Sequence, residues 1–436
     1  MTAEHQSRQR KRLTATVTDL DVVRQRALLI SVRLGNENTI DLERSAQELE
    51  LLIDTAGSDP VASVILNRAR PDAATFIGPG QAHELAQESR ALDVDVVVFD
   101  NDLTPAQQRN LQKIFETDVV DRVAVILDIF AQHATSRAGM MQVELALLRY
   151  HLPRLRGQGT KLSRQAGGIG TRGPGETKLE TDRRRITQRM SRLERDLRDV
   201  RQVRDTQRKS RRRTNIPTAA LVGYTNAGKS TLLNALTEAG VLTEDQLFST
   251  LDSTTRRWQV PGAQPVLLSD TVGFVRRLPH QLVEAFRSTL QEVVDADLLL
   301  HIVDASDPTA TDQITAVRDV LETIDAGAVP ELLVLNKLDT AERAGAERLR
   351  QLYPDAVGIS ALAGDGLDRL GEAIATALAK RLEQLTVAIP YDRGDVIAAI
   401  HRDGEVISER HTETGTGLTI RVSPDLAAQL KPFVVD

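Results

Sequence analysis

Residues 223–231 read Gly-Tyr-Thr-Asn-Ala-Gly-Lys-Ser-Thr, and they stand between the apolar run 219–222 and the helix-like stretch 232–236. This order of strand, glycine-rich turn and helix predicts a phosphate-binding loop, because backbone N–H groups of the turn and the positive end of the helix point at one spot. In such a loop Lys229 reaches the β and γ phosphates, and the Ser230 hydroxyl is placed for Mg²⁺. The predicted loop residues are Gly223, Tyr224, Thr225, Asn226, Ala227, Gly228, Lys229, Ser230 and Thr231.

The loop lies in a longer alternation of apolar strand-like runs and helix-like stretches that begins at Pro217. This alternation predicts an α/β domain with a doubly wound, mostly parallel sheet and with ligand groups at the ends of its strands. The predicted strands are 219–222, 258–260, 266–269, 298–303, 332–335 and 357–359.

Three further motifs follow apolar strands in the order that a guanine-nucleotide switch requires. Asp270 is expected near Mg²⁺ through water, and the Gly273 N–H within reach of the γ phosphate. The Asp339 carboxylate can accept two hydrogen bonds from guanine N1 and N2, a donor pair that adenine lacks, so the motif selects GTP over ATP. Backbone N–H groups of the third motif can be offered to guanine O6. The motifs are Asp270, Thr271, Val272 and Gly273; Asn336, Lys337, Leu338 and Asp339; and Ser360, Ala361 and Leu362.

The set of motifs resembles the translation-factor-like GTPases. By this resemblance a first switch lies between Lys229 and Asp270, and Thr250 is the second protein ligand of Mg²⁺ beside Ser230, with Thr254 and Thr255 as alternatives. GTP is then the substrate, Mg²⁺ the cofactor, and Lys229, Thr250 and Gly273 the catalytic residues. The switch residues are Phe248, Ser249, Thr250, Leu251 and Asp252.

Phe274 occupies the position at which many small GTPases place a glutamine that orients the attacking water. A phenyl ring cannot form the hydrogen bond that this task needs. We therefore expect a slow intrinsic GTPase that a partner, or a rearranged switch, completes.

Charge is distributed very unevenly along the 436 residues. The net charge is -6, yet residues 137–213 hold 22 Lys and Arg against 8 Asp and Glu, so the remainder of the chain is strongly acidic. A basic segment of this kind indicates a polyanionic partner. The sequence has no cysteine, which excludes disulfides, and no apolar run of about 18 residues, which argues against a membrane span. We expect a monomeric protein of the cytoplasm, of which no more than a part associates with membranes.

Residues 137–213 also show the pattern of a helical hairpin. An amphipathic stretch at 140–150 is followed by apolar residues of the second helix at heptad intervals (Leu179, Ile186, Met190, Leu193, Leu197 and Val200). The arginines of the second helix recur at every third position and drift around its surface, so a solvated helix with ion pairs is an equal alternative there. The connecting loop is rich in glycine and in cations, which suits irregular RNA. The candidate RNA-binding residues are Arg154, Arg156, Lys161, Arg164, Arg172 and Lys178.

Three segments of this region resemble the signature of the HflX family of ribosome-associated GTPases: 142–146 (Gln-Val-Glu-Leu-Ala), 152–155 (Leu-Pro-Arg-Leu) and 167–180 (Gly-Gly-Ile-Gly-Thr-Arg-Gly-Pro-Gly-Glu-Thr-Lys-Leu-Glu). The resemblance covers about residues 25–390. It implies an N-terminal α/β domain, an antiparallel helical hairpin that contacts the large ribosomal subunit and its RNA, and a GTPase domain. It further implies that stalled ribosomes are split or rescued under stress.

Strand–helix alternation up to about residue 130 agrees with a small α/β domain, and strand-like and helical runs after residue 385 predict a small α+β domain. A ribosome-assembly or RNA-remodelling GTPase, and a GTP switch with a protein effector, are the alternative functions. The predicted organisation is a polar lead at 1–20, the α/β domain at 21–135, the hairpin at 136–214, the GTPase domain at 215–384 and the α+β domain at 385–436.

Overall fold

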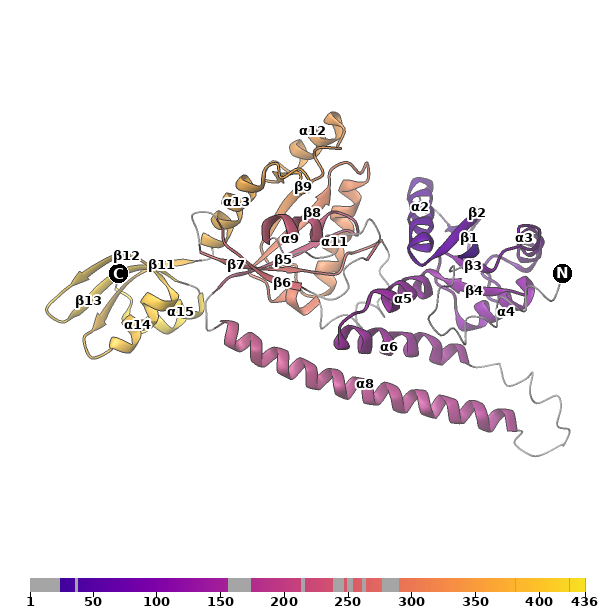
Figure 1. Ribbon diagram of the computed structural model, residues 1–436, viewed down its shortest axis with the longest axis horizontal. Helices are drawn as coiled ribbons and strands as arrows, with labels where there is room; N and C mark the ends of the chain where they lie inside the picture. The colour runs from indigo at the N-terminus through magenta and orange to yellow at the C-terminus, as the bar shows by residue number, and fades with distance from the viewer. Residues whose placement is uncertain are drawn as a thin grey trace, which may run out of the picture. The chain divides into compact units, whose positions relative to one another are not determined.

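The computed structural model describes residues 24–35, 38–155, 174–212, 216–237, 247–248, 254–260, 264–276, 290–380, 382–422 and 424–435. The chain divides into two compact units, Met1–Arg122 and Val123–Asp436. Figure 1 shows their secondary-structure elements. Among the described residues, no helix combines the length and the apolar character that crossing a membrane requires.

The first unit is a four-stranded parallel sheet with order β2-β1-β3-β4 and helices in its connections. β3 and the middle of β1 are buried, as expected for central parallel strands. Helix α4 begins where Thr104 and Gln107 form a capping box, with Pro105 in the first turn. The elements are β1 (Gln25–Leu34), α2 (Thr39–Thr55), β2 (Ser58–Arg68), α3 (Pro79–Ala91), β3 (Val96–Phe99), α4 (Pro105–Phe115) and β4 (Asp118–Asp121).

A buried ion cluster lies at the carboxyl ends of the strands of this first sheet. Arg122 follows β4 and pairs with Glu48 of α2 and with Asp100 after β3, each at 2.8 Å. The side chain of Arg122 is 2% exposed and that of Asp100 is 0% exposed. Ser45 adds a hydrogen bond to Asp100 at 2.6 Å. One buried cation therefore balances two buried carboxylates from different elements.

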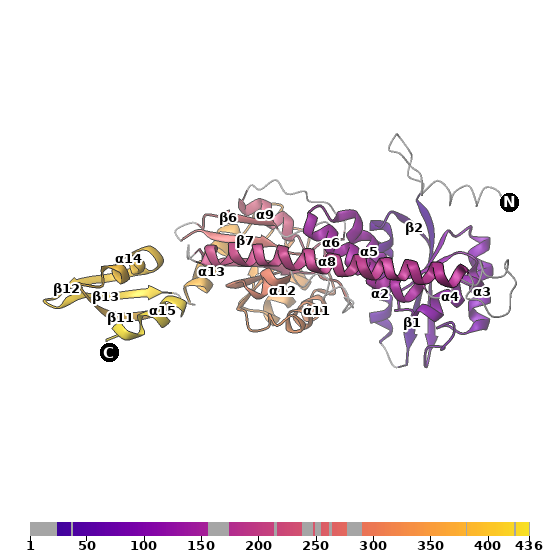
Figure 2. The same cartoon turned by 90° about the horizontal axis from the view of Figure 1, so that it is seen from below.

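The second unit begins with helices α5 (Arg122–His133), α6 (Arg137–His151) and the short 3-10 helix η1 (Leu152–Leu155), and continues with the long helix α8 (Pro174–Arg212). α6 and α8 run antiparallel (Figures 1 and 2). They share a small apolar core of Met141, Leu145, Leu193 and Leu197, with Leu148, Met190 and Val200 at its edge. The predicted hairpin and most of its apolar stripe are thus confirmed, while Leu179 lies among residues whose side chains are outside the description.

The central part of the second unit is a six-stranded sheet with order β10-β9-β8-β5-β7-β6, parallel except for β6. This is the doubly wound α/β fold that the sequence predicts. Its elements are β5 (Thr218–Gly223), α9 (Lys229–Thr237), β6 (Thr254–Trp258), β7 (Val266–Asp270), β8 (Leu298–Asp304), α11 (Ala310–Thr323), β9 (Glu331–Asn336), α12 (Arg343–Leu352), β10 (Val357–Gly358) and α13 (Leu367–Ala379).

Strand β6 differs from the sequence prediction, which places a strand at 258–260. The strand begins at Thr254 and ends at Trp258, paired antiparallel with β7. It is the edge strand of the sheet, and Arg256 and Arg257 on it are exposed. An edge strand needs few apolar residues, so its hydrophobic signal is weak.

The C-terminal residues form the predicted small α+β domain. Its three antiparallel strands have the order β11-β13-β12, and α14 and α15 pack on one side of the sheet (Figure 1). The elements are β11 (Glu383–Pro390), α14 (Gly394–Asp403), β12 (Glu405–His411), β13 (Gly415–Val422), α15 (Pro424–Leu430) and η2 (Lys431–Phe433).

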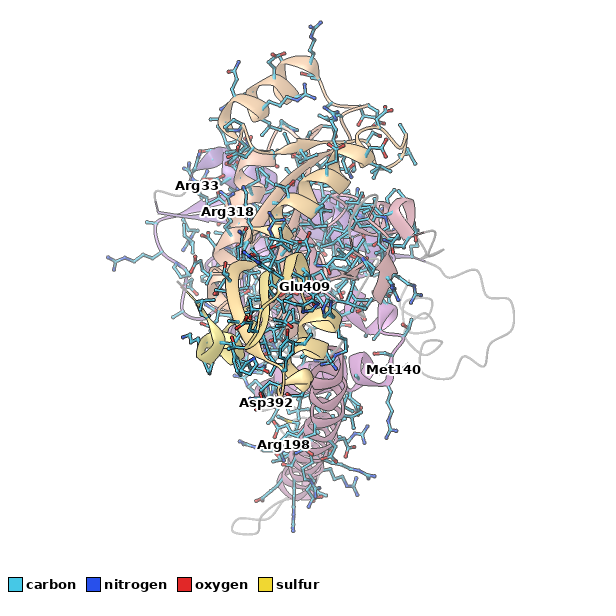
Figure 3. The ribbon with its side chains drawn as sticks, turned by 90° about the vertical axis from the view of Figure 1, so that its left-hand side faces the viewer. Arg33, Met140, Arg198, Arg318, Asp392 and Glu409 are labelled. Atoms are coloured by element: carbon cyan, nitrogen blue, oxygen red, sulfur yellow. The ribbon has the colours of Figure 1, made fainter. Side chains whose placement is uncertain are left out.

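A buried histidine in the central sheet makes stability depend on pH. His301 of β8 is 1% exposed, and its Nδ1 donates to Glu331 of β9 at 2.5 Å. Glu331 also accepts from Arg318 of α11, which Figure 3 labels, at 3.0 Å. Burial lowers the pKa of His301, and Glu331 opposes this only in part. For Glu331 the partners outweigh burial. Burial alone would raise the pKa of Glu331, but hydrogen bonds from His301 and Arg318 lower it.

We expect the free energy of unfolding to fall as pH decreases below about 6.5, because the unfolded chain then takes up a proton that folded His301 does not. The single tryptophan, Trp258 in β6, reports unfolding of this domain by fluorescence. His301→Gln should make the free energy of unfolding less dependent on pH between about 5 and 6.5, where a histidine of the unfolded chain takes up its proton. His83→Gln, at an exposed site of the first unit, should not. Equal pH slopes in the wild type and His301→Gln would refute this assignment.

Candidate guanine-nucleotide site

The loop between β5 and α9 packs so tightly that two of its positions admit only glycine. Gly223 has φ +151°, and an added Cβ would lie 2.2 Å from the Ile302 carbonyl oxygen of β8. Gly228 has φ +92°, and its added Cβ would lie 2.3 Å from Asn336 Nδ2. At both positions the backbone has a positive φ and lies so close to a neighbouring strand that a side chain would clash. The loop backbone is therefore held directly against the ends of β8 and β9.

Lys229, the first residue of α9, is buried within this loop. Its side chain donates from Nζ to the carbonyl oxygens of Gly223 at 3.2 Å and Tyr224 at 2.8 Å. Burial lowers the pKa of Lys229 to about 8, although the charge of Asp270 acts in the opposite direction. An anion bound beside this amine would favour its charged form. The electrostatics of the loop thus match a phosphate ligand.

Ser230, in the first turn of α9, lies beside Asp270, the last residue of β7. Ser230 Oγ donates to Asp270 Oδ2 at 2.6 Å, and Asp270 is 0% exposed at the end of β7. A hydroxyl and a carboxylate are hard oxygen donors of the kind that Mg²⁺ prefers, with water and phosphate oxygens completing its shell. The residues present fit this ion. Within the described ranges, no cluster of three or more His, Cys, Asp or Glu side chains could hold a metal by itself.

The Asp-Thr-Val-Gly motif continues into a segment that is bridged to the phosphate loop. The Phe274 N–H donates to the Gly223 carbonyl at 3.1 Å, and the Thr225 N–H donates to the Phe274 carbonyl at 2.8 Å. The Tyr224 hydroxyl accepts from the Arg276 N–H at 2.7 Å, a contact that sequence reasoning missed because it joins residues 52 apart. Phe274 is 2% exposed, so its ring packs in the interior.

Gly273 lies beside two other predicted site residues, Thr225 and Lys229. A Cβ added there would be 2.8 Å from Thr225 Cγ2 and 3.1 Å from Lys229 Nζ. Gly273 and Lys229, both expected at the γ phosphate, are thus adjacent in space although they are far apart in the sequence.

Asn336 connects the predicted base-binding motifs to the phosphate loop. Its side chain is buried, donates from Nδ2 to the Ala227 carbonyl at 2.9 Å, and accepts at Oδ1 from the Ala361 N–H at 3.0 Å. The Ser360 N–H donates to the Asp365 carbonyl at 3.0 Å. Asp339 lies exposed beyond β9. Two of the three N–H groups predicted to face guanine O6 are therefore also donors within the protein.

Lys337 continues this motif in a left-handed backbone conformation, with φ +60°. Its Nζ pairs with Asp304 Oδ2, at the end of β8, at 2.7 Å. The motif is thereby tied to the neighbouring strand.

Part of the predicted first switch, Ser249, Thr250, Leu251 and Asp252, lies outside the described residues. Phe248 is described; it is 2% exposed and packs edge-on against Phe130 of α5, with ring centroids 4.7 Å apart. Of the alternatives to Thr250, Thr255 forms a hydrogen bond with Ser269 at 2.8 Å, and Thr254 is the register partner of Asp270.

Most of the predicted RNA-binding residues also lie outside the description: Arg156, Lys161, Arg164 and Arg172, and the side chain of Lys178. Arg154 is described, and its guanidinium stacks 3.5 Å from the centroid of the Tyr150 ring.

Helix α8 carries a shallow, open hollow that sequence reasoning did not single out. Its volume is about 580 Å³, and side chains of one helix face form its lining. Side chains project from α8 on several sides around Arg198 (Figure 3). The charge of residues 137–213 indicated this region, but only helical geometry shows which arginines share one face. The lining residues are Arg184, Thr187, Gln188, Ser191, Arg192 and Arg195.

Three family models match the chain. Residues 43–131 match the model described as GTP-binding GTPase N-terminal, and residues 133–211 match GTP-binding GTPase Middle Region. Residues 218–337 match the model described as 50S ribosome-binding GTPase.

Curated relatives match almost the whole chain. A protein named GTPase HflX from Lacrimispora saccharolytica is 45% identical over 94% of this chain and 97% of its own length. The protein of that name from Escherichia coli is 43% identical over 90% of this chain and 92% of its own. A solved structure of a GTP-binding protein from Sulfolobus solfataricus in complex with GDP is 23% identical, with a TM-score of 0.40, over 82% of this chain and 99% of that one.

Proposed function

This chain belongs to the HflX family of GTPases and hydrolyses GTP, and from that premise we propose that it binds the large ribosomal subunit and splits or rescues stalled ribosomes under stress. The observation that carries the proposal is the combination, in one chain, of a guanine-nucleotide site with a basic helical hairpin. The G-domain model it matches is described as a 50S ribosome-binding GTPase, which supports the same partner.

In this proposal Lys229 and the N–H groups of its loop hold the β and γ phosphates, and the Gly273 N–H contacts the γ phosphate. Ser230 and Thr250 are the protein ligands of Mg²⁺, and Asp270 acts through water. Bound Mg²⁺ neutralises charge on the β and γ phosphate oxygens. Asp339 selects guanine, while Asn336 fixes the base-binding loops to the phosphate loop through its two hydrogen bonds.

The remaining motif residues complete the nucleotide pocket through backbone groups and packing. Phe274 is buried and has no polar atom in its ring, so it leaves water orientation to other groups. Intrinsic hydrolysis should be slow, and ribosome binding should raise it.

The hairpin supplies the contact with ribosomal RNA. Lys and Arg side chains that neutralise phosphates release counterions, so binding should weaken steeply as salt is raised. Arg154, Arg156, Lys161, Arg164, Arg172 and Lys178 remain proposed contacts, and the exposed arginines of α8 join them. The protein acts as a monomer in the cytoplasm, where its partner is found.

Gradient sedimentation with 70S ribosomes tests the proposal. With a non-hydrolysable GTP analogue, we expect the 70S peak to fall and free subunits to rise, with the protein on the large subunit. Binding only to precursor subunits would support an assembly role instead. Binding that ignores salt would favour a protein effector.

Two variants that remove the same charge test whether the α8 face binds the large subunit. Replacing Arg184, Arg192 and Arg195 by Gln should weaken large-subunit binding and reduce the salt slope by about 2 to 3, because each phosphate contact contributes about 0.7 to 0.9. The same replacement of Arg343, Arg348 and Arg350 on α12 removes equal charge and should leave binding unchanged. Equal effects of the two variants would show that net charge, and not the α8 face, governs binding.

A further inference from the structure

One hydroxyl in the phosphate loop forms no hydrogen bond with any residue that the structure describes. Thr225 is 7% exposed, and its N–H is already engaged with the Phe274 carbonyl. Its Oγ1 is buried as well. A buried hydroxyl left without a partner costs about 1 to 3 kcal/mol, so a partner from outside the protein is expected.

The position of Thr225 indicates which partner this is. Its Cγ2 lies beside Gly273, at the point that Lys229 Nζ also approaches. Oγ1 and Cγ2 are bonded to the same Cβ, so the hydroxyl belongs to the same corner of the site. Lys229 and Gly273 are the two residues expected at the γ phosphate. A γ phosphate held by Lys229 and Gly273 would therefore bring its oxygens, and the water that attacks it, close to the Thr225 hydroxyl.

The same corner lacks the polar side chain that orients the attacking water in many small GTPases. Phe274 stands at that position, 2% exposed, and its ring can neither donate nor accept a conventional hydrogen bond. A threonine hydroxyl can do both at once.

We propose that Thr225 is a catalytic residue of GTP hydrolysis. Its hydroxyl accepts a hydrogen bond from the attacking water and donates one to a γ-phosphate oxygen. The water oxygen then bonds to the γ phosphorus, and the bond from that phosphorus to the β–γ bridging oxygen breaks. GDP leaves with the bonding electron pair, the phosphate keeps the water oxygen, and the water proton passes to a phosphate oxygen. Thr225 keeps its own proton throughout.

Thr225→Val and Thr225→Ser separate the hydroxyl from the methyl group. Valine keeps the shape and the contact with Gly273 but removes the hydroxyl, whereas serine keeps the hydroxyl. We expect Thr225→Val to slow single-turnover hydrolysis of bound Mg²⁺–GTP by about 10- to 100-fold, the value of one hydrogen bond to a charged group. The hydrolysis rate of Thr225→Ser should stay within about threefold of the wild-type rate, a change smaller than the loss of one such hydrogen bond would cause.

Affinity for GDP, measured by titration, should be unchanged in both variants, because GDP has no γ phosphate. Thr237→Val removes a half-buried hydroxyl of α9 that donates to the Leu233 carbonyl and serves as the matched control. The assay contains no ribosomes, so its result is independent of the proposed partner.

Three results would overturn the proposal. Hydrolysis by Thr225→Val at the wild-type rate would show that the hydroxyl takes no part. Slowing in Thr225→Ser as large as that in Thr225→Val would show that the hydroxyl is not the group responsible, because serine keeps it. Loss of GDP affinity in Thr225→Val would show that the side chain supports the loop itself rather than the reaction.

Discussion

Replacing Asp339 by asparagine should lower the affinity for GDP by about 10²- to 10⁴-fold, because each of the two hydrogen bonds to the charged carboxylate contributes about 1.5 to 3 kcal/mol. The carboxylate accepts hydrogen bonds from guanine N1–H and from the N2 amino group. The asparagine amide keeps one acceptor but turns the second position into a donor, which then faces the amino group of guanine. The same substitution should raise the affinity for xanthosine diphosphate, whose C2 oxygen accepts a hydrogen bond where guanine donates one.

Competition titrations with GDP and xanthosine diphosphate measure this change of specificity. Asp339 is exposed, so its replacement should leave the fold intact, which Trp258 fluorescence can verify. Asp365→Asn makes the same change of charge at an exposed site near the third motif and should bind GDP normally. If Asp339→Asn lost affinity for both nucleotides equally, base recognition would have to lie elsewhere.

Replacing Arg122 by methionine should reduce the free energy of unfolding of the first unit by about 3 to 5 kcal/mol, the cost typical of removing one partner from a buried ion pair. Methionine fills much of the volume, but Asp100 and Glu48 would remain buried side by side without their cation. A buried carboxylate without a counterion is strongly disfavoured in its charged form.

Hydrogen exchange of the amides in β1 and β3 measures the stability of this unit separately from the rest of the chain. Arg24→Met is the matched control, because Arg24 pairs with Asp54 and Asp59 with a side chain that is 39% exposed, and exposed pairs contribute about 0 to 1 kcal/mol. Adding Asp100→Asn and Glu48→Gln to Arg122→Met should restore part of the loss. An effect of Arg122→Met no larger than that of Arg24→Met would contradict a stabilising role for the cluster.

The sequence alone determined the class of the fold and the chemistry of the nucleotide site. The loop 223–231 carries its information locally, because glycine conformations, an apolar strand and a helix start are properties of neighbouring residues. The same holds for the apolar stripe of α8. A basic segment of 22 Lys and Arg against 8 Asp and Glu could likewise be read without coordinates.

Tertiary structure alone decided how these local pieces are joined. The hydrogen bonds of Asn336 to Ala227 and Ala361 span 109 and 25 residues, and Arg122 meets Asp100 and Glu48 from separate elements. The edge position of β6 and the buried Thr225 hydroxyl likewise depend on which strands and loops become neighbours. Sequence periodicity records which face of an element is buried, whereas contacts between distant segments arise only when the sheets are assembled.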